Sequence, residues 1–357
     1  MPLAIAAKKA GFEVVVATRV NAHGDMIKDA GLRLLPLTAF CRRGINPWRE
    51  WGAIREIYRL YRQERPDLIH QVALKPVLYG SLAAWSAGCG KVVNAMAGLG
   101  FVFGSERRLA RLLRPLVRQA FRWLLNRPGS RLILQNRDDM AQFAREGLAT
   151  RESIVLIRGA GVDTARFMPM AEPAGVPLVM LPSRLLWDKG VGEFVEAAAL
   201  LRRQGVTARF VLVGDGDCEN PASVPPEQLE SWRREGVVEW WGRQENMPTV
   251  LGQAHIVCLP TYYREGLPKM LLEAAACAKP IIAADVPGCR EIVLPGENGL
   301  LVPPRDAEVL AAAINNLLED AELRQRMGAA GRRLVEREFA QEIVIEQTLR
   351  LYREMLA

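Results

Sequence analysis

Cysteine and histidine are scarce in this sequence. Its 357 residues include six cysteines and three histidines, and no two cysteines are spaced as Cys-x-x-Cys. Zinc sites and disulfide frameworks use closely spaced or paired ligands of these types. We therefore expect free thiols in a reducing compartment, with neither a metal site nor a disulfide framework.

Long apolar runs are missing as well. No apolar stretch reaches the roughly twenty residues that a membrane-spanning helix needs, and Lys8 and Lys9 interrupt the apolar start. We expect neither a membrane span nor a signal peptide. Half of the residues are apolar and 24% are charged, which is typical of a globular protein with room for two domains. The net charge of +7 favours an anionic partner.

The first half alternates between helical and strand patterns. Helices are expected over 3–10, 23–30 and 48–64, and strands over 13–18, 32–37 and 68–71. This alternation predicts an α/β fold with a parallel sheet and crossover helices. Such a sheet normally opens with a strand that becomes central, whereas this sequence opens on a helical pattern. We therefore hypothesise that the first strand of the N-terminal domain is missing.

The stretch 255–291 predicts a buried strand, a tight turn and a helix. Gly266 lets the backbone pass close to a ligand, and Pro268 suits the first turn of a helix. Glu265 stands at the turn, and Glu273 follows about two helical turns later. The unpaired N–H groups of a helix N-terminus suit phosphate. The alternative is an ordinary surface helix that carries two acids.

A second strand-to-helix turn, at 183–190, carries Arg184 and Lys189. An arginine fork and a lysine point charge can hold a diphosphate and neutralise it as a leaving group without a metal. Two surface cations are the plainer alternative. The next strand ends in a glycine turn with Gly214 and Gly216. Its Asp215-Gly216-Asp217 run is a literal D-x-D, which we attribute to chance.

The stretch 260–291 resembles the E-x7-E region of retaining glycosyltransferases of family 4, which have the GT-B fold. The segments 183–190, 214–216 and 298–302 are similar to that family's R-x-x-x-x-K-G, G-x-G and N-G-x-L-V motifs. The resemblance implies roles for matching residues. Glu265 would contact the donor sugar and Glu273 the nucleotide ribose. The diphosphate would lie on the amides of Gly266 and Leu267, with Arg184 and Lys189.

His70, the Lys75-Pro76 and Tyr79-Gly80 pairs, and the run 98–103 together resemble a narrower group within that family. This group acts on polyprenyl-diphosphate-linked saccharides. The resemblance makes His70, Gly98 and Gly100 candidates for the acceptor side, although a lone histidine is more often structural. Many family members have a histidine near the position of Ala97, which is small here.

Residues 105–131 predict a basic amphipathic helix. Leucines form one stripe, Glu106 is the only acid, and Pro115 is expected to kink or split the helix. Arginines recur at spacings of three and four: Arg107, Arg111, Arg114, Arg118 and Arg122. Such helices lie on anionic bilayers, so we expect membrane contact here. A core-packed helix with a solvated arginine face is the alternative, and no nucleic-acid motif is present.

These patterns predict two Rossmann-like domains that face across a cleft. Residues 1–167 would bind the acceptor, 168–338 the nucleotide sugar, and 339–357 would form a helix that returns to the first domain. The resemblance implies an enzyme that moves a sugar from a UDP-sugar to a lipid-linked saccharide with retention, without metal or other cofactor. It would lie on the inner face of the cytoplasmic membrane. A nucleotide-sugar epimerase of the same fold and an inactive nucleotide-sugar-binding subunit are the alternatives.

Overall fold

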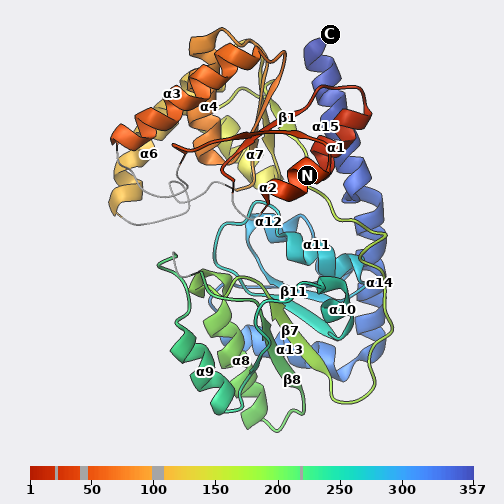
Figure 1. Ribbon diagram of the computed structural model, residues 1–357. Helices are drawn as coiled ribbons and strands as arrows, with labels where there is room; N and C mark the ends of the chain where they lie inside the picture. The colour runs from red at the N-terminus through yellow and green to blue at the C-terminus, as the bar shows by residue number, and fades with distance from the viewer. Residues whose placement is uncertain (21–22, 41–46, 99–107, 218–219) are drawn as a thin grey trace. The chain divides into compact units, whose positions relative to one another are not determined.

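The described residues divide into two compact α/β units. The computed structural model describes residues 1–20, 23–40, 47–98, 108–217 and 220–357. One unit comprises Met1–Ile157 and Val344–Ala357, and the other comprises Arg158–Ile343 (Figure 1). Each unit has its own parallel sheets, as the alternation of helix and strand patterns predicts.

The first unit contains two separate parallel sheets. Its strands are β1 (Val15–Thr18), β2 (Arg33–Pro36), β3 (Ile69–Val72), β4 (Val92–Met96), β5 (Ser130–Leu134) and β6 (Ile154–Leu156). β1 pairs only with β2, and the other four lie in the order β3-β4-β5-β6. Among the described residues, β1 and β3 each therefore have one edge without a strand partner.

Helices cover these sheets. They are α1 (Pro2–Lys9), α2 (Gly24–Asp29), α3 (Pro47–Glu64), α4 (Leu74–Ala87), α6 (Arg108–Leu124) and α7 (Arg137–Arg145). Most of the C-terminal helix α15 (Gln341–Leu356) belongs to this unit, because Val344, Leu349 and Tyr352 share a buried cluster with Val93 and Ile133. Of the expected kink or split at Pro115, the split does not occur, because α6 continues through the proline as one helix.

The second unit is built on one six-stranded parallel sheet in the order β12-β11-β10-β7-β8-β9. The strands are β7 (Leu178–Pro182), β8 (Arg209–Val213), β9 (Glu239–Trp240), β10 (Ile256–Leu259), β11 (Ile281–Ala284) and β12 (Gly299–Val302). From β7 the chain winds one way to β9, and from β10 it winds the other way to β12. The winding therefore reverses between β7 and β10, and ligands of open α/β sheets bind at such a point.

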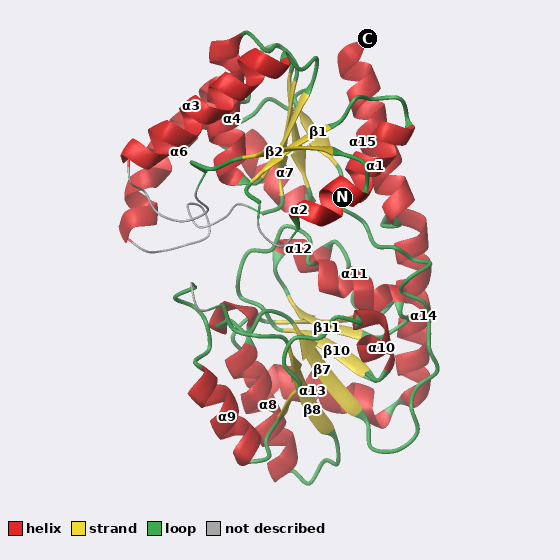
Figure 2. Ribbon diagram, in the orientation of Figure 1, coloured by secondary structure: helices red, strands yellow, loops and turns green. Residues whose placement is uncertain are grey.

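Two layers of helices enclose this sheet (Figure 2). Alternate residues of β7 face opposite layers: Val179 and Leu181 join one buried cluster, and Leu178 and Met180 join the other. The first cluster includes α8 (Val191–Arg203), α9 (Pro226–Arg234) and α13 (Ala307–Glu319). The second includes α10 (Met247–Gly252), α11 (Lys269–Ala276), α12 (Pro287–Arg290) and α14 (Ala321–Glu338).

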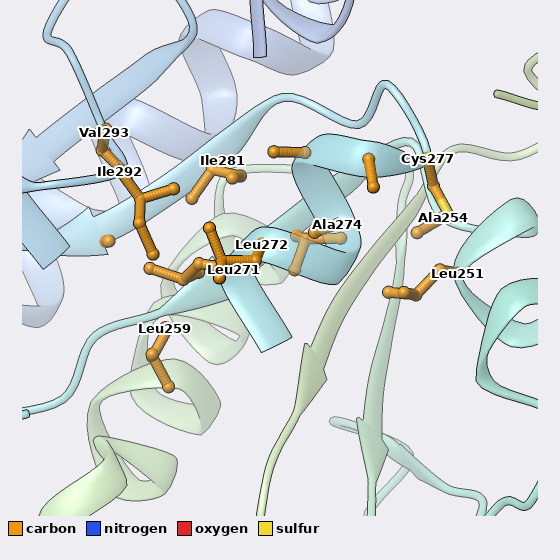
Figure 3. Packing of buried hydrophobic residues seen from close by; sticks show 14 of the residues in the cluster. Leu251, Ala254, Leu259, Leu271, Leu272, Ala274, Cys277, Ile281, Ile292 and Val293 are labelled. Atoms are coloured by element: carbon orange, nitrogen blue, oxygen red, sulfur yellow. The ribbon is translucent and has the colours of Figure 1, made fainter. Parts of the chain in front are cut away.

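The packing of α11 fixes the loop in front of it. Leu271 and Leu272 lie in the buried cluster beside Leu259, Ile281 and Ile292 (Figure 3). Burying a leucine side chain stabilises a fold by roughly 1.5–3 kcal/mol. The apolar face of α11 thus holds its N-terminus against the carboxyl end of β10.

Candidate functional site

The loops that follow β7 and β10 meet where the winding of the sheet reverses. The first leads to the short 3-10 turn η1 (Trp187–Lys189) and the second leads to α11. The Lys189 ammonium donates to Oε1 of Glu265, and these side chains are only 13% and 12% exposed. Two residues 76 positions apart in the sequence, both predicted to bind the donor, thus form one ion pair.

Thr261 joins the two loops. Its fully buried Oγ1 lies 2.8 Å from the carbonyl oxygen of Asp188 and 3.3 Å from Oε1 of Glu265. The same carbonyl accepts the backbone N–H groups of Tyr262 and Tyr263, each at 3.1 Å. These bonds fix the position of Glu265 relative to Lys189.

Gly190 allows the loops to come this close. Its φ is +77°, a conformation that side chains with a Cβ rarely adopt, and a Cβ there would lie 2.1 Å from the carbonyl oxygen of Pro260. The glycine after Lys189 is therefore required by the contact between the two loops.

Arg184, in the loop that follows β7, contacts the loop that follows β8. Its Nη1 is 3.4 Å from Oδ2 of Asp217, and its side chain is 52% exposed. Gly214 has a φ of +131°, and a Cβ there would lie 2.0 Å from the carbonyl oxygen of Ser183. A Cβ on Gly216 would lie 2.6 Å from Oγ of Ser223. The predicted glycine loop therefore packs directly against the segment that carries Arg184.

The turn before α11 differs in one detail from the prediction. Pro268 is the N-cap with an extended backbone, and the helix begins at Lys269. Glu273 lies one helical turn further on, and one of its oxygens is 3.1 Å from Nζ of Lys269. A Cβ on Gly288 would lie 2.5 Å from the carbonyl oxygen of Gly266, so α12 packs against this turn. Gly266 and Leu267 thus stand between the two predicted glutamates.

The electrostatics of the site are set by partial burial. Burial raises the pKa of the Asp188 carboxyl above its ordinary value, the charge of Glu265 adds to this, and Lys189 opposes it. Oδ1 of Asp188 is buried without a hydrogen-bond partner in the described part of the chain. Across those described residues, no group of three or more histidine, cysteine or acidic side chains is arranged to hold a metal ion.

The acceptor-side candidates lie in the first unit. Nδ1 of His70 is hydrogen-bonded to the Tyr352 hydroxyl, and the two rings meet edge to face at 5.7 Å. Burial lowers the pKa of His70 to about 4, so the ring is neutral near pH 7. Gly98 has a φ of +123°, and Gly100 lies outside the described residues.

The arginine helix is partly packed into the first unit. Arg118 forms an ion pair with Glu146 at 2.8 Å, and Arg122 donates to the carbonyl oxygen of the same residue at 3.0 Å. Leu112 and Leu116 are instead 73% and 69% exposed. Arg111 is exposed and Arg114 half-buried, and Arg107 lies outside the described residues. Two leucines of the expected stripe are thus exposed, which departs from the alternative of a core-packed helix with a solvated arginine face.

Sequence reasoning missed the residues that hold the donor candidates in place. Thr261, the carbonyl of Asp188 and the carboxylate of Asp217 act through contacts between loops that are far apart in the sequence. The sequence could have indicated these residues only through their positions near strand ends: Thr261 lies two residues after β10, and Asp217 belongs to the D-x-D run.

In the described chain no helix is both long and apolar enough to cross a membrane.

The two α/β units with parallel sheets, and the site at the winding reversal between β7 and β10 of the second unit, define the GT-B class of glycosyltransferase folds. The family model described as Glycosyl transferases group 1 matches residues 167–334, and the one described as Glycosyl transferase 4-like matches residues 1–136. The chain therefore belongs to the family 4 glycosyltransferases.

Individual relatives agree with this assignment. An N,N'-diacetylbacillosaminyl-diphospho-undecaprenol alpha-1,3-N-acetylgalactosaminyltransferase of Campylobacter jejuni is 29% identical over 99% of this chain and 94% of its own length. An alpha-D-kanosaminyltransferase of Streptomyces kanamyceticus is 30% identical over 69% of this chain and 65% of its own length.

Solved structures support the fold. Anabaena Alr3699/HepE, solved in complex with UDP, superimposes with a TM-score of 0.80 at 20% identity, over 99% of this chain and 95% of that one. A sucrose-phosphate synthase of Thermosynechococcus elongatus gives 0.78 at 22% identity, over 99% and 91%. These identities are low, so the two structures bear on the fold alone.

Proposed function

We propose that this glycosyltransferase moves a hexose or N-acetylhexosamine from a UDP-sugar to a polyprenyl-diphosphate-linked saccharide. The observation that carries the donor half is the pairing of Lys189 with Glu265 at the reversal of the sheet, beside Arg184. The acceptor half is supported by the Campylobacter relative, whose name specifies a saccharide linked to diphospho-undecaprenol. The product would serve in the synthesis of a cell-surface polysaccharide or glycan.

In this proposal the donor lies along the carboxyl ends of β7, β8 and β10. Lys189, Arg184 and the amides of Gly266 and Leu267 hold the diphosphate. Glu265 orients the sugar and Glu273 the ribose, while Gly214 and Gly216 leave room for the donor. Fixed cations stabilise the charge that develops on a leaving diphosphate, so the reaction needs no metal.

We propose that transfer retains the anomeric configuration. An acceptor hydroxyl attacks the anomeric carbon on the face that the diphosphate leaves. The bond from that carbon to the diphosphate oxygen breaks, a bond to the acceptor oxygen forms, and the hydroxyl proton passes to the departing UDP. Lys189 and Arg184 take up the negative charge that accumulates on UDP.

The first unit would receive the acceptor, with His70, Gly98 and Gly100 near it. In α6, exposed Leu112 and Leu116 are suited to shallow insertion into a bilayer, and Arg111 and the other arginines of the helix to anionic headgroups. We place the enzyme on the inner face of the cytoplasmic membrane, as a peripheral protein.

A screen of UDP-sugars against polyprenyl-diphosphate saccharides tests the proposal. Mass spectrometry should show one sugar added to one acceptor, UDP should be released only when that acceptor is present, and NMR should show the donor's anomeric configuration in the product. An altered UDP-sugar formed without an acceptor would identify an epimerase. UDP binding with no turnover against any acceptor would identify an inactive binding subunit.

A further inference from the structure

Helix α3 exposes a continuous stripe of tryptophan and arginine. The stripe residues are spaced by three or four positions, so they share one face of the helix, and all are exposed: Trp48, Trp51, Arg55, Arg59 and Arg62. Trp48 is 85% exposed and Trp51 is 63% exposed. Two large aromatic side chains at one end of a surface helix, followed by three cations, are unusual for a face exposed only to water.

The acids of α3 do not neutralise this stripe, because each is engaged with another part of the first unit. Glu50 pairs with Lys75 of α4 at 2.7 Å. Glu56 accepts the backbone N–H groups of Thr38 at 2.8 Å and Ala39 at 3.0 Å. Glu64 at the end of the helix pairs with Arg33. The exposed face thus keeps its positive charge while the acids anchor the helix.

The rest of α3 is fixed to the unit. Ala53 and Ile57 are buried, and α3 packs along α4, which also contacts α6 (Figure 1). The stripe therefore lies on a helix that is fixed to the unit. Its neighbour α4 also contacts α6, the helix proposed above to contact lipid.

We propose that this α3 stripe binds an anionic bilayer surface and is a second membrane contact beside α6. Tryptophan partitions to the membrane interface, and arginine binds phosphate headgroups through two parallel hydrogen bonds. One weak contact gives only marginal binding, and two together give stable attachment. The inference deepens the membrane part of the proposed function and rests on it.

A protein partner is the competing occupant, because tryptophan and arginine are also enriched at protein interfaces. Charge favours lipid. The stripe carries three arginines and no acid, and the chain has a net charge of +7. On α6, the exposed Leu112 follows the exposed Arg111. A bilayer with anionic headgroups complements all of these features at once.

Vesicle flotation tests the inference on the full chain at low salt. The vesicles are phosphatidylcholine alone or phosphatidylcholine mixed with phosphatidylglycerol. We expect the wild type to float only with the anionic vesicles. Arg55→Glu/Arg59→Glu should lower the apparent affinity by about tenfold or more, and Trp48→Ala/Trp51→Ala should also weaken it. The control Arg326→Glu/Arg333→Glu makes the same charge change on exposed positions of α14 and should float like the wild type.

Two results would overturn the inference. In the first, the α3 variants float on anionic vesicles as well as the α14 control does. In the second, the wild type does not float on these vesicles and instead self-associates through the stripe as its concentration rises. Turnover measured with a short-chain, water-soluble acceptor distinguishes failure of the membrane inference from failure of the enzymatic proposal. An enzyme that turns over but does not need α3 to float loses only the membrane inference. Flotation that depends on α3 without any turnover would instead count against the proposed function.

Discussion

Among single residues, the enzymatic proposal depends most on Lys189 and Glu265, which form an ion pair. We expect Lys189→Ala and Glu265→Ala each to lower the turnover of UDP-sugar by about a hundredfold or more, because Lys189 would stabilise the charge on the leaving diphosphate and Glu265 would orient the donor sugar. The measurement is UDP release with the preferred donor and acceptor. Unchanged circular dichroism would show that the fold persists, and ordinary turnover rates in either variant would refute the assignment of these residues.

His70 gives a pH-dependent prediction. Burial lowers its pKa to about 4, against 6.5 for an ordinary histidine. Above pH 6.5 the ring is neutral in the folded and unfolded states. As the pH falls from 6.5 toward 4 only the unfolded chain takes up the proton, so the free energy of unfolding falls, by up to about 3 kcal/mol.

Urea unfolding of the wild type and His70→Asn across this pH window measures the effect. The variant also loses the bond to Tyr352, but that loss does not depend on pH near neutrality. We therefore expect the stability of the variant to fall less steeply with acid. Parallel curves for the two proteins would mean that His70 is not held in its neutral form.

At the scale of single elements, the start of α8 is tied to the loop after β10 through Gly190. Gly190→Ala should destabilise the second unit by about 2 kcal/mol or more, because an alanine is strained at a φ of +77° and would also meet the carbonyl oxygen of Pro260. Turnover should fall with it, since the contact positions Lys189.

Gly205 supplies a matched control for this prediction. It has a φ of +79°, and a Cβ there meets nothing within 4 Å. Gly205→Ala should therefore show only the backbone strain, with turnover kept. Chemical unfolding and UDP release measure both variants, and equal losses at the two positions would show that the contact with Pro260 is unimportant.

Helices and strands with strong local patterns could be predicted from the sequence, and their surroundings could not. The sequence predicts helices over 3–10 and 48–64, and α1 and α3 match them closely. The behaviour of α6 was harder to predict. Its neighbours in space, such as Glu146, decide which arginines are engaged and which leucines stay exposed, and a single-helix pattern contains no information about them.

At the scale of the whole molecule, the alternation of helix and strand patterns predicts the α/β fold, and the resemblance of the donor motifs to those of family 4 implies the GT-B fold. Contacts such as Thr261 to Asp188 could not be predicted, because they join loops only after the whole sheet has formed.

Calorimetric titration of UDP tests the central claim most directly, which is that Arg184 and Lys189 hold the diphosphate of the donor. Arg184→Ala and Lys189→Ala should each weaken UDP binding by about tenfold or more, since each removes a charge-assisted contact to phosphate. Arg234→Ala, at an exposed arginine of α9 in the same unit, should bind UDP as the wild type does. Unchanged UDP affinity in both the Arg184 and Lys189 variants would contradict the account.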